Sequence, residues 1–418
     1  MKVFKFGGAS INDADGFKNL YEIVSQERSD LIIVVSAIGK TTNALEIVLK
    51  AWMTGDPAYE NYLDNVKDVH YRILTKLFSA EDDAVQLLYH AFKFLRDYLK
   101  SDKKGDYDFE YDQVISYGEI WSSILVYEYL KSRLKGVTLV DIRDCLKTDN
   151  RHRDADILWE ESVVRTNTTF NFLNHKTYVT QGFIGGTAKG DTSTLGREGS
   201  DYTAAVLANM LNAESVTVWK DVPGILNADP KWMDDALKLE EMSYREAVEM
   251  TFSGAKVIHP KTIKPLQNKN IPLHVKSFIN PSEQGTLIKA EAAIRKVVPV
   301  FIKKEDQILI SIVPRDFSFV MGDNLSRIFH SFMFLGIKVN LVESSAVSLD
   351  VCVDDERSRI DKLLENFKPE FSVVYNENVE MLTIRHFTAD AVRRITEGRE
   401  ILLEQRTRST VRYVVRKA

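Results

Sequence analysis

The segment GFIGGTAKGDTSTLGREGSDYTAAVLANML, residues 182–211, joins the end of a strand to the start of a helix through a glycine-rich loop. Its first eighteen residues include Gly182, Gly185, Gly186, Gly190, Gly196 and Gly199. Core packing does not call for so many glycines. Close approach of backbone N–H groups to a phosphate or another anion does, and a helix N-terminus at SDYTAA adds its positive end. The segment therefore predicts an anion-binding loop, with a plain flexible loop as the alternative.

The polar residues of this loop are of the types that bind small anionic molecules. The planar fork of Arg197 suits a carboxylate or a phosphate bidentately. Ser200 or Asp201 could also be the N-cap of the following helix, a structural role that is compatible with a functional one.

The rest of the first half of the chain alternates strands and helices. Buried strands are predicted at KVFKF (2–6), LIIVVSA (31–37), GVTLVD (136–141), TYVTQGFIGG (177–186) and ESVTVWKD (214–221), and a helical segment at about 51–135. Continuous apolar strands that alternate with helices indicate an α/β fold with a mostly parallel sheet. In such sheets ligands bind at the carboxyl ends of the strands, where the glycine-rich loop lies.

Bulk composition excludes several classes of protein. The chain has 418 residues, is 44% hydrophobic and 28% charged, and has a net charge of −5 with a pI near 6.0, which gives no reason to propose nucleic acid or an anionic membrane as partner. Cys145 and Cys352 stand far apart, without zinc-ligand or disulfide spacing. No run of eighteen apolar residues occurs. We expect a cytoplasmic protein without a protein-bound metal.

The stretch IIVVSAIGKTTNAL, residues 32–45, has the Gly-Lys-Thr ending of a P-loop. A P-loop needs a further glycine five residues before Gly39, where its backbone turns around a phosphate. Val34 occupies that place, and a β-branched residue inside an apolar run belongs to a strand. The spacing therefore argues against a P-loop.

Two other glycine turns carry lysines at strand ends. KFGGAS places Lys5 beside Gly7 and Gly8, as phosphoryl transfer requires of a cation with nearby backbone donors. WKDVPGILNADPK, residues 219–231, supplies further charged groups. In SGAKVIHPKTI, His259 before Pro260 is expected to be a structural or capping residue rather than a base.

The pattern changes from about residue 290. Strands and helices there form two small modules of β-α-β-β type, the second ending early, after a boundary segment at 277–290 that contains Pro281 and Gly285. The predicted domains are 1–290 (catalytic), 291–377 and 378–418.

The order of these motifs resembles that of aspartate kinase over essentially the whole chain. The motifs are, in order, KFGGAS, VVSAIGKTTN, SYGE, TLGREGSDYTA, WKDVPGILNADPK and FSGAKVIHP, and paired small modules follow them. The resemblance implies the three-layer α/β/α sandwich of the amino-acid kinase superfamily followed by tandem ferredoxin-like ACT modules. It implies transfer of the ATP γ-phosphoryl group to the side-chain carboxylate of L-aspartate with Mg²⁺, the first step of lysine, threonine and methionine biosynthesis. SAIGKTTN would be a substrate loop.

The resemblance also implies roles for individual residues. Lys5 matches the lysine that stabilises the transferring phosphoryl group, and Asp201 the aspartate that orients it. The implied substrate contacts are Ser36, Thr42, Glu119, Arg197 and Ser200. The implied nucleotide contacts are Lys5, Gly7, Gly8, Lys220, Asp221, Leu226, Asp229, Lys231 and Lys256.

Some positions depart from the family pattern. Ala9 replaces a threonine, Glu198 a glycine and Leu226 a tyrosine, while Lys220 and Lys231 replace a threonine and an arginine. We expect altered substrate and nucleotide affinity rather than loss of activity.

ACT modules in this family bind end-product amino acids and build the dimer, so a homodimer or dimer of dimers and a lysine or threonine effector are expected. The effector residues implied are Asn324, Leu325, Val339, Asn340 and Ser345. Ala346 stands where lysine-sensitive members commonly carry glutamate, which weakens the lysine hypothesis. Two alternative functions are a related kinase such as glutamate 5-kinase and a catalytically weakened amino-acid sensor.

Overall fold

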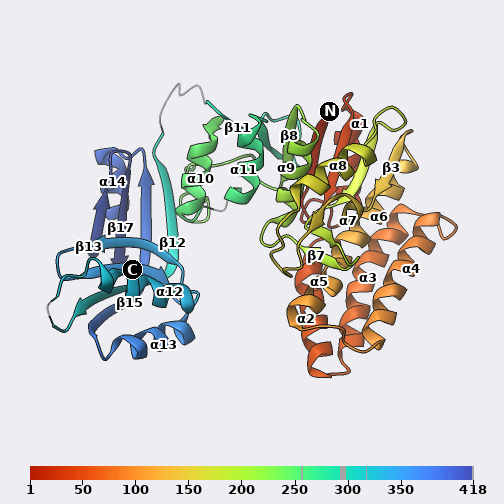
Figure 1. Cartoon of the computed structure of the whole chain (residues 1–418). Helices are drawn as coiled ribbons and strands as arrows, with labels where there is room; N and C mark the ends of the chain where they lie inside the picture. The colour runs from red at the N-terminus through yellow and green to blue at the C-terminus, as the bar shows by residue number, and fades with distance from the viewer. Residues whose placement is uncertain (256–257, 292–297, 317, 417–418) are drawn as a thin grey trace. The chain divides into compact units, whose positions relative to one another are not determined.

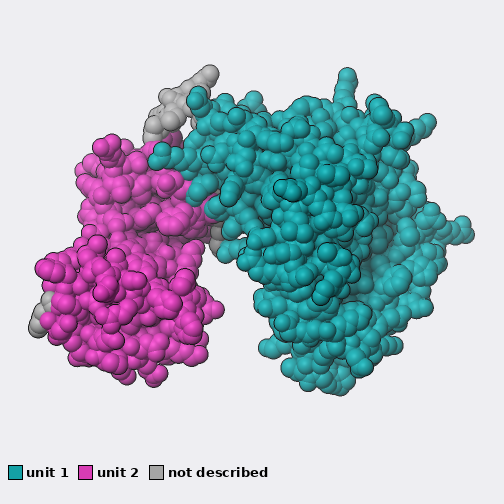
Figure 2. Space-filling model, viewed as in Figure 1, with its two compact units in different colours: residues 1–225, 238–248, 258–293 teal, residues 226–237, 249–257, 294–418 magenta. Residues whose placement is uncertain are grey.

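The computed structural model describes residues 1–255, 258–291, 298–316 and 318–416. The chain forms two compact units (Figures 1 and 2). Unit 1 contains residues 1–225, 238–248 and 258–293, and unit 2 contains 226–237, 249–257 and 294–418. Among the described residues, no helix combines the length and the apolar character that a bilayer crossing requires. The predicted domain boundaries stay a prediction.

Unit 1 is built on an eight-stranded sheet with the order β3-β5-β2-β1-β8-β10-β11-β9. Its strands are β1 (Lys2–Phe6), β2 (Leu31–Val35), β3 (Val137–Val140), β5 (Thr177–Gln181), β8 (Ser215–Lys220), β9 (Glu241–Ser243), β10 (Leu273–Ser277) and β11 (Thr286–Lys289). All pairs except β10–β11 are parallel. The central strand β1 therefore ends beside the ends of β2 and β8, which brings their following loops to one edge.

Helices cover both faces of this sheet. The helices of unit 1, together with α10 at its boundary, are α1 (Ala14–Ser25), α2 (Thr41–Thr54), α3 (Tyr59–Leu77), α4 (Asp83–Lys100), α5 (Tyr107–Ile115), α6 (Tyr117–Lys131), α7 (Ile142–Cys145), α8 (Trp159–Thr169), α9 (Gly199–Met210), α10 (Tyr244–Phe252) and α11 (Pro260–Asn268). Alternate residues of β1 and β2 pack against α1, α2 and α6, whereas α9 packs on the other face beside α11. Asp13 caps α1 by accepting from Gly16 N at 2.9 Å.

Helices α3–α6 form the helical segment predicted at about 51–135, and α2 reaches it only with its last residues. Aromatic side chains fill its centre. The Trp121 ring stacks on Phe92 with a centroid distance of 3.8 Å, and His70 packs edge-on against both rings. His70 is fully buried, and burial lowers its pKa to about 4. These aromatic side chains therefore serve to pack the helices against one another.

One predicted strand is wrong. Residues 177–186 do not form a single strand, because β5 ends at Gln181 and the backbone turns at Phe183, which has a left-handed φ of 70°. The chain then enters a separate three-stranded sheet of β4 (Lys147–Thr148), β6 (Ile184–Thr187) and β7 (Thr192–Thr194).

Unit 2 is built on a six-stranded antiparallel sheet with the order β13-β14-β12-β15-β17-β16. Its elements are β12 (Val300–Pro314), α12 (Asp323–Phe334), β13 (Val339–Ser344), β14 (Leu349–Asp354), α13 (Arg357–Phe367), β15 (Phe371–Arg385), α14 (Ala389–Thr396), β16 (Ile401–Arg406) and β17 (Thr410–Arg416). The long strands β12 and β15 run through both halves of the sheet, so the two small modules share them. Gln405 of β16 donates to Val342 O of β13, which brings the two edge strands together.

We expect Phe92→Ala to lower the free energy of unfolding by about 3–5 kcal/mol, because it removes a buried ring stacked on Trp121. Phe94→Ala is the matched control, since Phe94 lies on the same helix but is 69% exposed while Phe92 is 4% exposed. The control should change stability by less than about 0.5 kcal/mol. Urea unfolding followed by circular dichroism measures both, and equal effects would contradict this assignment of the core.

Candidate active site

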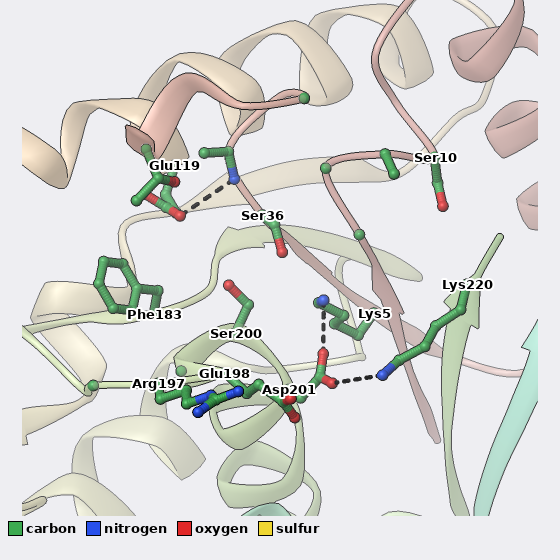
Figure 3. Close-up of a pocket in the computed structure, with 18 of the residues that line it drawn as sticks. Lys5, Ser10, Ser36, Glu119, Phe183, Arg197, Glu198, Ser200, Asp201 and Lys220 are labelled. Carbon is green, nitrogen blue, oxygen red and sulfur yellow. Dashed lines mark hydrogen bonds and ion pairs between the residues drawn. The ribbon is translucent and has the colours of Figure 1, made fainter. Parts of the chain in front are cut away.

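A pocket of about 600 Å³ opens at the carboxyl ends of β1, β2 and β8 in unit 1 (Figure 3). It brings together most of the residues proposed from sequence, namely Lys5, Gly7, Gly8, Ser36, Thr42, Glu119, Arg197, Ser200, Asp201, Lys220 and Asp221. These residues are up to 216 positions apart in sequence (221 − 5), so the parallel sheet is what assembles them.

The charged centre of the pocket is a buried carboxylate between two lysines. Asp201 Oδ1 lies 2.6 Å from Lys5 Nζ, and Asp201 Oδ2 lies 3.7 Å from Lys220 Nζ. Burial alone would raise the pKa of Asp201, but the two ammonium groups hold it below its ordinary value. Asp201 is therefore an anion that fixes Lys5 at the end of β1.

Lys5 is followed by a turn that requires glycine at one position. A Cβ on Gly8 would lie 2.1 Å from Ala37 O, whereas one on Gly7 would meet no atom closer than 3.8 Å. Gly8 O also accepts from Gly39 N at 2.9 Å. The close approach of the Gly7–Gly8 and Ala37–Gly39 loops thus depends on the absence of a side chain at Gly8.

Glu119 is a buried carboxylate with spare hydrogen-bonding capacity. Its Oε1 accepts from Ala37 N at 3.3 Å, while Oε2 has no partner among the described residues. Burial raises the pKa of Glu119 to about 8. A carboxyl group in such a state is poised to receive a cationic group, whose charge would favour the ionised form.

Arg197 and Ser200 lie where the glycine-rich loop enters α9. The helix begins at Gly199 with Glu198 in the N-cap position, so the N-cap role that the sequence left open for Ser200 or Asp201 is excluded. The left-handed φ of 54° at Glu198 ends the loop before Ser200 is reached. Arg197 consequently lies in an exposed turn, and Ser200 and Asp201 lie in the first helical turn.

Further pocket residues were not proposed as ligands from sequence. Phe183 and Trp219 adjoin motifs that sequence analysis did identify, so their position beside these motifs could have indicated them. Tyr111 and Arg153 lie in segments with no motif. Arg153 is held by Asp108 at 3.1 Å and lies over the Tyr111 ring at 4.7 Å.

The other predicted nucleotide residues belong to a different part of the chain. Leu226, Asp229 and Lys231 lie in the 226–237 segment of unit 2, where Asp229 Oδ1 accepts from Lys231 N at 2.9 Å. Their nucleotide contacts stay a prediction. Lys256 lies outside the described residues. His259 caps α11 by accepting from Lys261 N through Nδ1, as predicted.

The predicted effector residues lie on two parts of unit 2. Asn324 and Leu325 begin α12, and Val339 and Asn340 begin β13, with Ser345 directly after that strand. Asn340 is buried in a network in which it donates to Gln307 and Asp354. Ser345 bonds to Ser348. An effector role for these residues stays a prediction.

Among the described residues, no cluster of three or more His, Cys, Asp or Glu side chains could hold a metal ion. Asp201, one of the carboxylates that line the pocket, is already paired with two lysines. These donors do not fit a resident metal.

The fold and the pocket together define a class of α/β protein with a pocket lined by charged residues at the carboxyl edge of a mostly parallel sheet. Comparison with known proteins specifies the class. The amino acid kinase family model matches residues 1–277. The chain is 31% identical to lysine-sensitive aspartokinase 3 of Escherichia coli over 358 residues, which cover 84% of this chain and 78% of that protein.

Solved structures agree with the sequence matches. Escherichia coli aspartokinase III in complex with aspartate and ADP superposes with a TM-score of 0.84 at 26% identity, covering 100% of this chain and 96% of the other. The chain also matches a bifunctional aspartokinase/homoserine dehydrogenase of Haemophilus influenzae at 29% identity over 90% of its length, but spans only 47% of that relative. The chain therefore belongs to the amino acid kinase family, and within it to the aspartokinases. The predicted fold class is confirmed.

We expect Gly8→Ala to lower the melting temperature by about 4 °C or more, because its new methyl group would overlap Ala37 O and force the two loops apart. Gly7→Ala is the matched control, since a methyl group there has room and neither glycine has a left-handed φ. Differential scanning calorimetry compares the two variants. A Gly8→Ala protein as stable as the Gly7→Ala protein would contradict the packing described.

Proposed function

We propose that this chain transfers the γ-phosphoryl group of ATP to the side-chain carboxylate of L-aspartate, giving 4-phospho-L-aspartate and ADP. The observation that carries the proposal is the charge pattern of one pocket. A fixed cation at a glycine turn, Lys5, lies in the same pocket as a buried carboxyl with a free oxygen, Glu119, and a guanidinium, Arg197. These groups are complementary to a phosphoryl group, an ammonium group and a carboxylate respectively.

The pocket could orient the substrate through the substrate's α-ammonium and α-carboxylate groups. The α-ammonium group would bind Glu119 Oε2, and the α-carboxylate would bind Arg197. Ser36, Thr42 and Ser200 line the same pocket and offer hydroxyl groups to the side-chain carboxylate. Bringing this carboxylate to the phosphoryl group makes the reaction effectively unimolecular.

In the transfer itself, a side-chain carboxylate oxygen of aspartate forms a bond to the γ-phosphorus. The bond from that phosphorus to the β,γ-bridging oxygen breaks, and ADP leaves. The attacking carboxylate is already ionised at neutral pH, so no general base is required. Lys5, held by Asp201, would stabilise the charge on the transferring group, and Gly7 and Gly8 would bring backbone N–H groups close to it.

The nucleotide would bind as its magnesium complex, in which Mg²⁺ offsets the negative charge of the phosphates. Lys220 and Asp221 line the pocket next to the Lys5–Asp201 pair and are the proposed nucleotide contacts from unit 1. The further nucleotide contacts that we propose lie outside the lining of the pocket and are Leu226, Asp229, Lys231 and Lys256. The solved aspartokinase III complex with aspartate and ADP supports the choice of ligands.

The proposal extends to regulation. Unit 2, with its paired small modules, would bind an amino-acid effector and join subunits into a dimer or a dimer of dimers in the cytoplasm. Another solved structure of E. coli aspartokinase III is a complex with lysine and aspartate in the T-state, with a TM-score of 0.80 at 26% identity. That complex supports lysine as the effector to test before threonine, although Ala346 leaves no carboxylate at that position for an effector amine.

The test is ATP-dependent phosphorylation of L-aspartate, trapped as the hydroxamate, with L-glutamate as the control substrate. We expect product from aspartate alone, and a loss of at least about 100-fold in kcat for Lys5→Ala because a cation at the reacting phosphoryl group is removed. Product from glutamate instead would favour a glutamate kinase. No product from folded protein that still binds an amino acid would favour a sensor.

We expect the KM for L-aspartate to fall as pH rises from 6 to 8 and to level off above 8. The reason is that Glu119, with its pKa raised to about 8, must lose its proton before it can pair with the substrate's ammonium group. Glu119→Gln should raise KM and abolish this pH dependence. Initial rates at fixed saturating ATP measure both, and a KM that is independent of pH in the wild type would contradict the role of Glu119.

A further inference from the structure

Three bulky residues with left-handed backbone line the active-site pocket: Arg153 with φ of 67°, Phe183 with φ of 70° and Glu198 with φ of 54°. The other non-glycine residues of this kind in the described chain are Asn212, Asn270, Asp306, Asn378 and His386. Asn, Asp and His adopt this conformation readily, whereas Arg, Phe and Glu do not. Strain of this type persists where surrounding contacts hold it, and it concentrates at functional sites.

Glu198 is the one of these three that sits between two residues of the proposed mechanism. It follows Arg197, the proposed ligand of the substrate's α-carboxylate, and it occupies the N-cap position of α9, which carries Asp201 in its first turn. Glu198 O accepts from Tyr202 N at 3.1 Å, so its backbone already belongs to the helix start. The conformation at Glu198 therefore sets the direction in which the chain presents Arg197.

The side chain of Glu198 is tied to another helix of unit 1. Its Oε2 accepts from His259 N at 2.9 Å, directly before the first residue of α11. Lys261, in the first turn of α11, donates from Nζ to Leu195 O at 3.1 Å and pairs with Asp154 at 2.6 Å. The start of α11 thus holds the turn at both ends, by Lys261 at Leu195 and by the His259 amide at Glu198.

The carboxylate has two opposing effects on a substrate. Its negative charge lies one residue from Arg197 and would weaken the attraction of a substrate carboxylate, whereas its hydrogen bond to His259 N fixes the turn that carries Arg197. A glycine would adopt the same backbone without strain but would provide no tether. The observed strain, together with a charge-assisted hydrogen bond that offsets it, favours the tether as the dominant effect.

We infer that Glu198 is a positioning residue, which acts through the His259 amide to hold Arg197 in place for the substrate's α-carboxylate. The inference rests on the proposed function, because it assigns to Arg197 a carboxylate ligand. It predicts that loss of the acceptor oxygen of residue 198 weakens aspartate affinity more than loss of its charge does. A neutral amide would give a weaker hydrogen bond to His259 N but would also remove the negative charge beside Arg197, and these two effects oppose each other.

The test compares three variants at this position with one at its partner. Glu198→Ala and Glu198→Gly remove the acceptor, Glu198→Gln keeps an acceptor oxygen without the charge, and His259→Ala keeps the backbone N–H that Glu198 uses. His259→Ala also removes the Nδ1 cap of α11, so it destabilises the same junction without cutting the tether. The measurements are KM for L-aspartate, KM for ATP, kcat and melting temperature, with L-aspartate binding by calorimetry.

We expect Glu198→Ala and Glu198→Gly to raise KM for L-aspartate and its dissociation constant about tenfold, the effect of losing one hydrogen bond to a charged group. Their kcat and KM for ATP should stay within about twofold. Glu198→Gln and His259→Ala should keep the wild-type KM for L-aspartate, the latter with a lower melting temperature.

An unchanged or lowered KM in Glu198→Gly would overturn the inference and assign the residue an inhibitory charge instead. A raised KM in His259→Ala would also overturn it, because junction stability and not the tether would then control affinity. If the wild type binds and phosphorylates L-aspartate but Glu198→Ala and Glu198→Gly have the same KM as the wild type, only this inference fails. If the wild type does neither, the proposed function fails and the inference falls with it.

Discussion

The buried pair of Lys5 and Asp201 is the interaction on which the site depends. It joins the end of the central strand β1 to the first turn of α9, which packs against that strand. Both side chains are almost completely buried, and removing one partner of such a pair typically costs about 3–5 kcal/mol because the other charge is left unpaired. A well-packed apolar pair could replace them at little cost in stability. The pair is therefore better explained by the role proposed for it, which is to keep a cation at the carboxyl end of β1.

This pair is possible only because of the strand order. Parallel pairing of β1 with β2 on one side and β8 on the other places three carboxyl ends next to one another. The loop after β1 supplies glycines, the loop after β2 supplies Ser36, the first turn of α2 supplies Thr42, and the end of β8 supplies Lys220. An antiparallel strand in the middle would send one of these loops to the opposite edge of the sheet. The chemistry of the site therefore follows from a topological property and not from any single motif.

Sequence reasoning succeeded where the neighbouring residues in the chain are enough to indicate a residue's role. Glycine at position 8 and lysine at the end of a strand are local features, and the structure has them where they were expected. The break between β5 and β6 and the early start of α9 were missed, because both depend on left-handed backbone at residues that do not favour it, Phe183 and Glu198. Such conformations are imposed by tertiary contacts, which a single sequence does not reveal. Arg153 was missed for a different reason, because it lines the pocket from a segment without a motif.

The charges of the pocket explain how two anionic substrates could share it. Its lining includes four cationic residues, Lys5, Arg153, Arg197 and Lys220, and four acidic residues, Glu119, Glu198, Asp201 and Asp221. If all eight were ionised the pocket would be neutral. Burial, however, raises the pKa of Glu119 to about 8, so near neutral pH Glu119 keeps its proton in the empty pocket. The pocket then carries a net positive charge that attracts anions.

Protonation of Glu119 also bears on which anions the pocket selects. An amino acid that brings its own ammonium group to Glu119 would favour release of the Glu119 proton, so the carboxylate forms only when a cation is present to pair with it. A substrate without an ammonium group would leave Glu119 protonated and would gain no ion pair there, which gives the pocket a physical basis for selecting amino acids over other carboxylates.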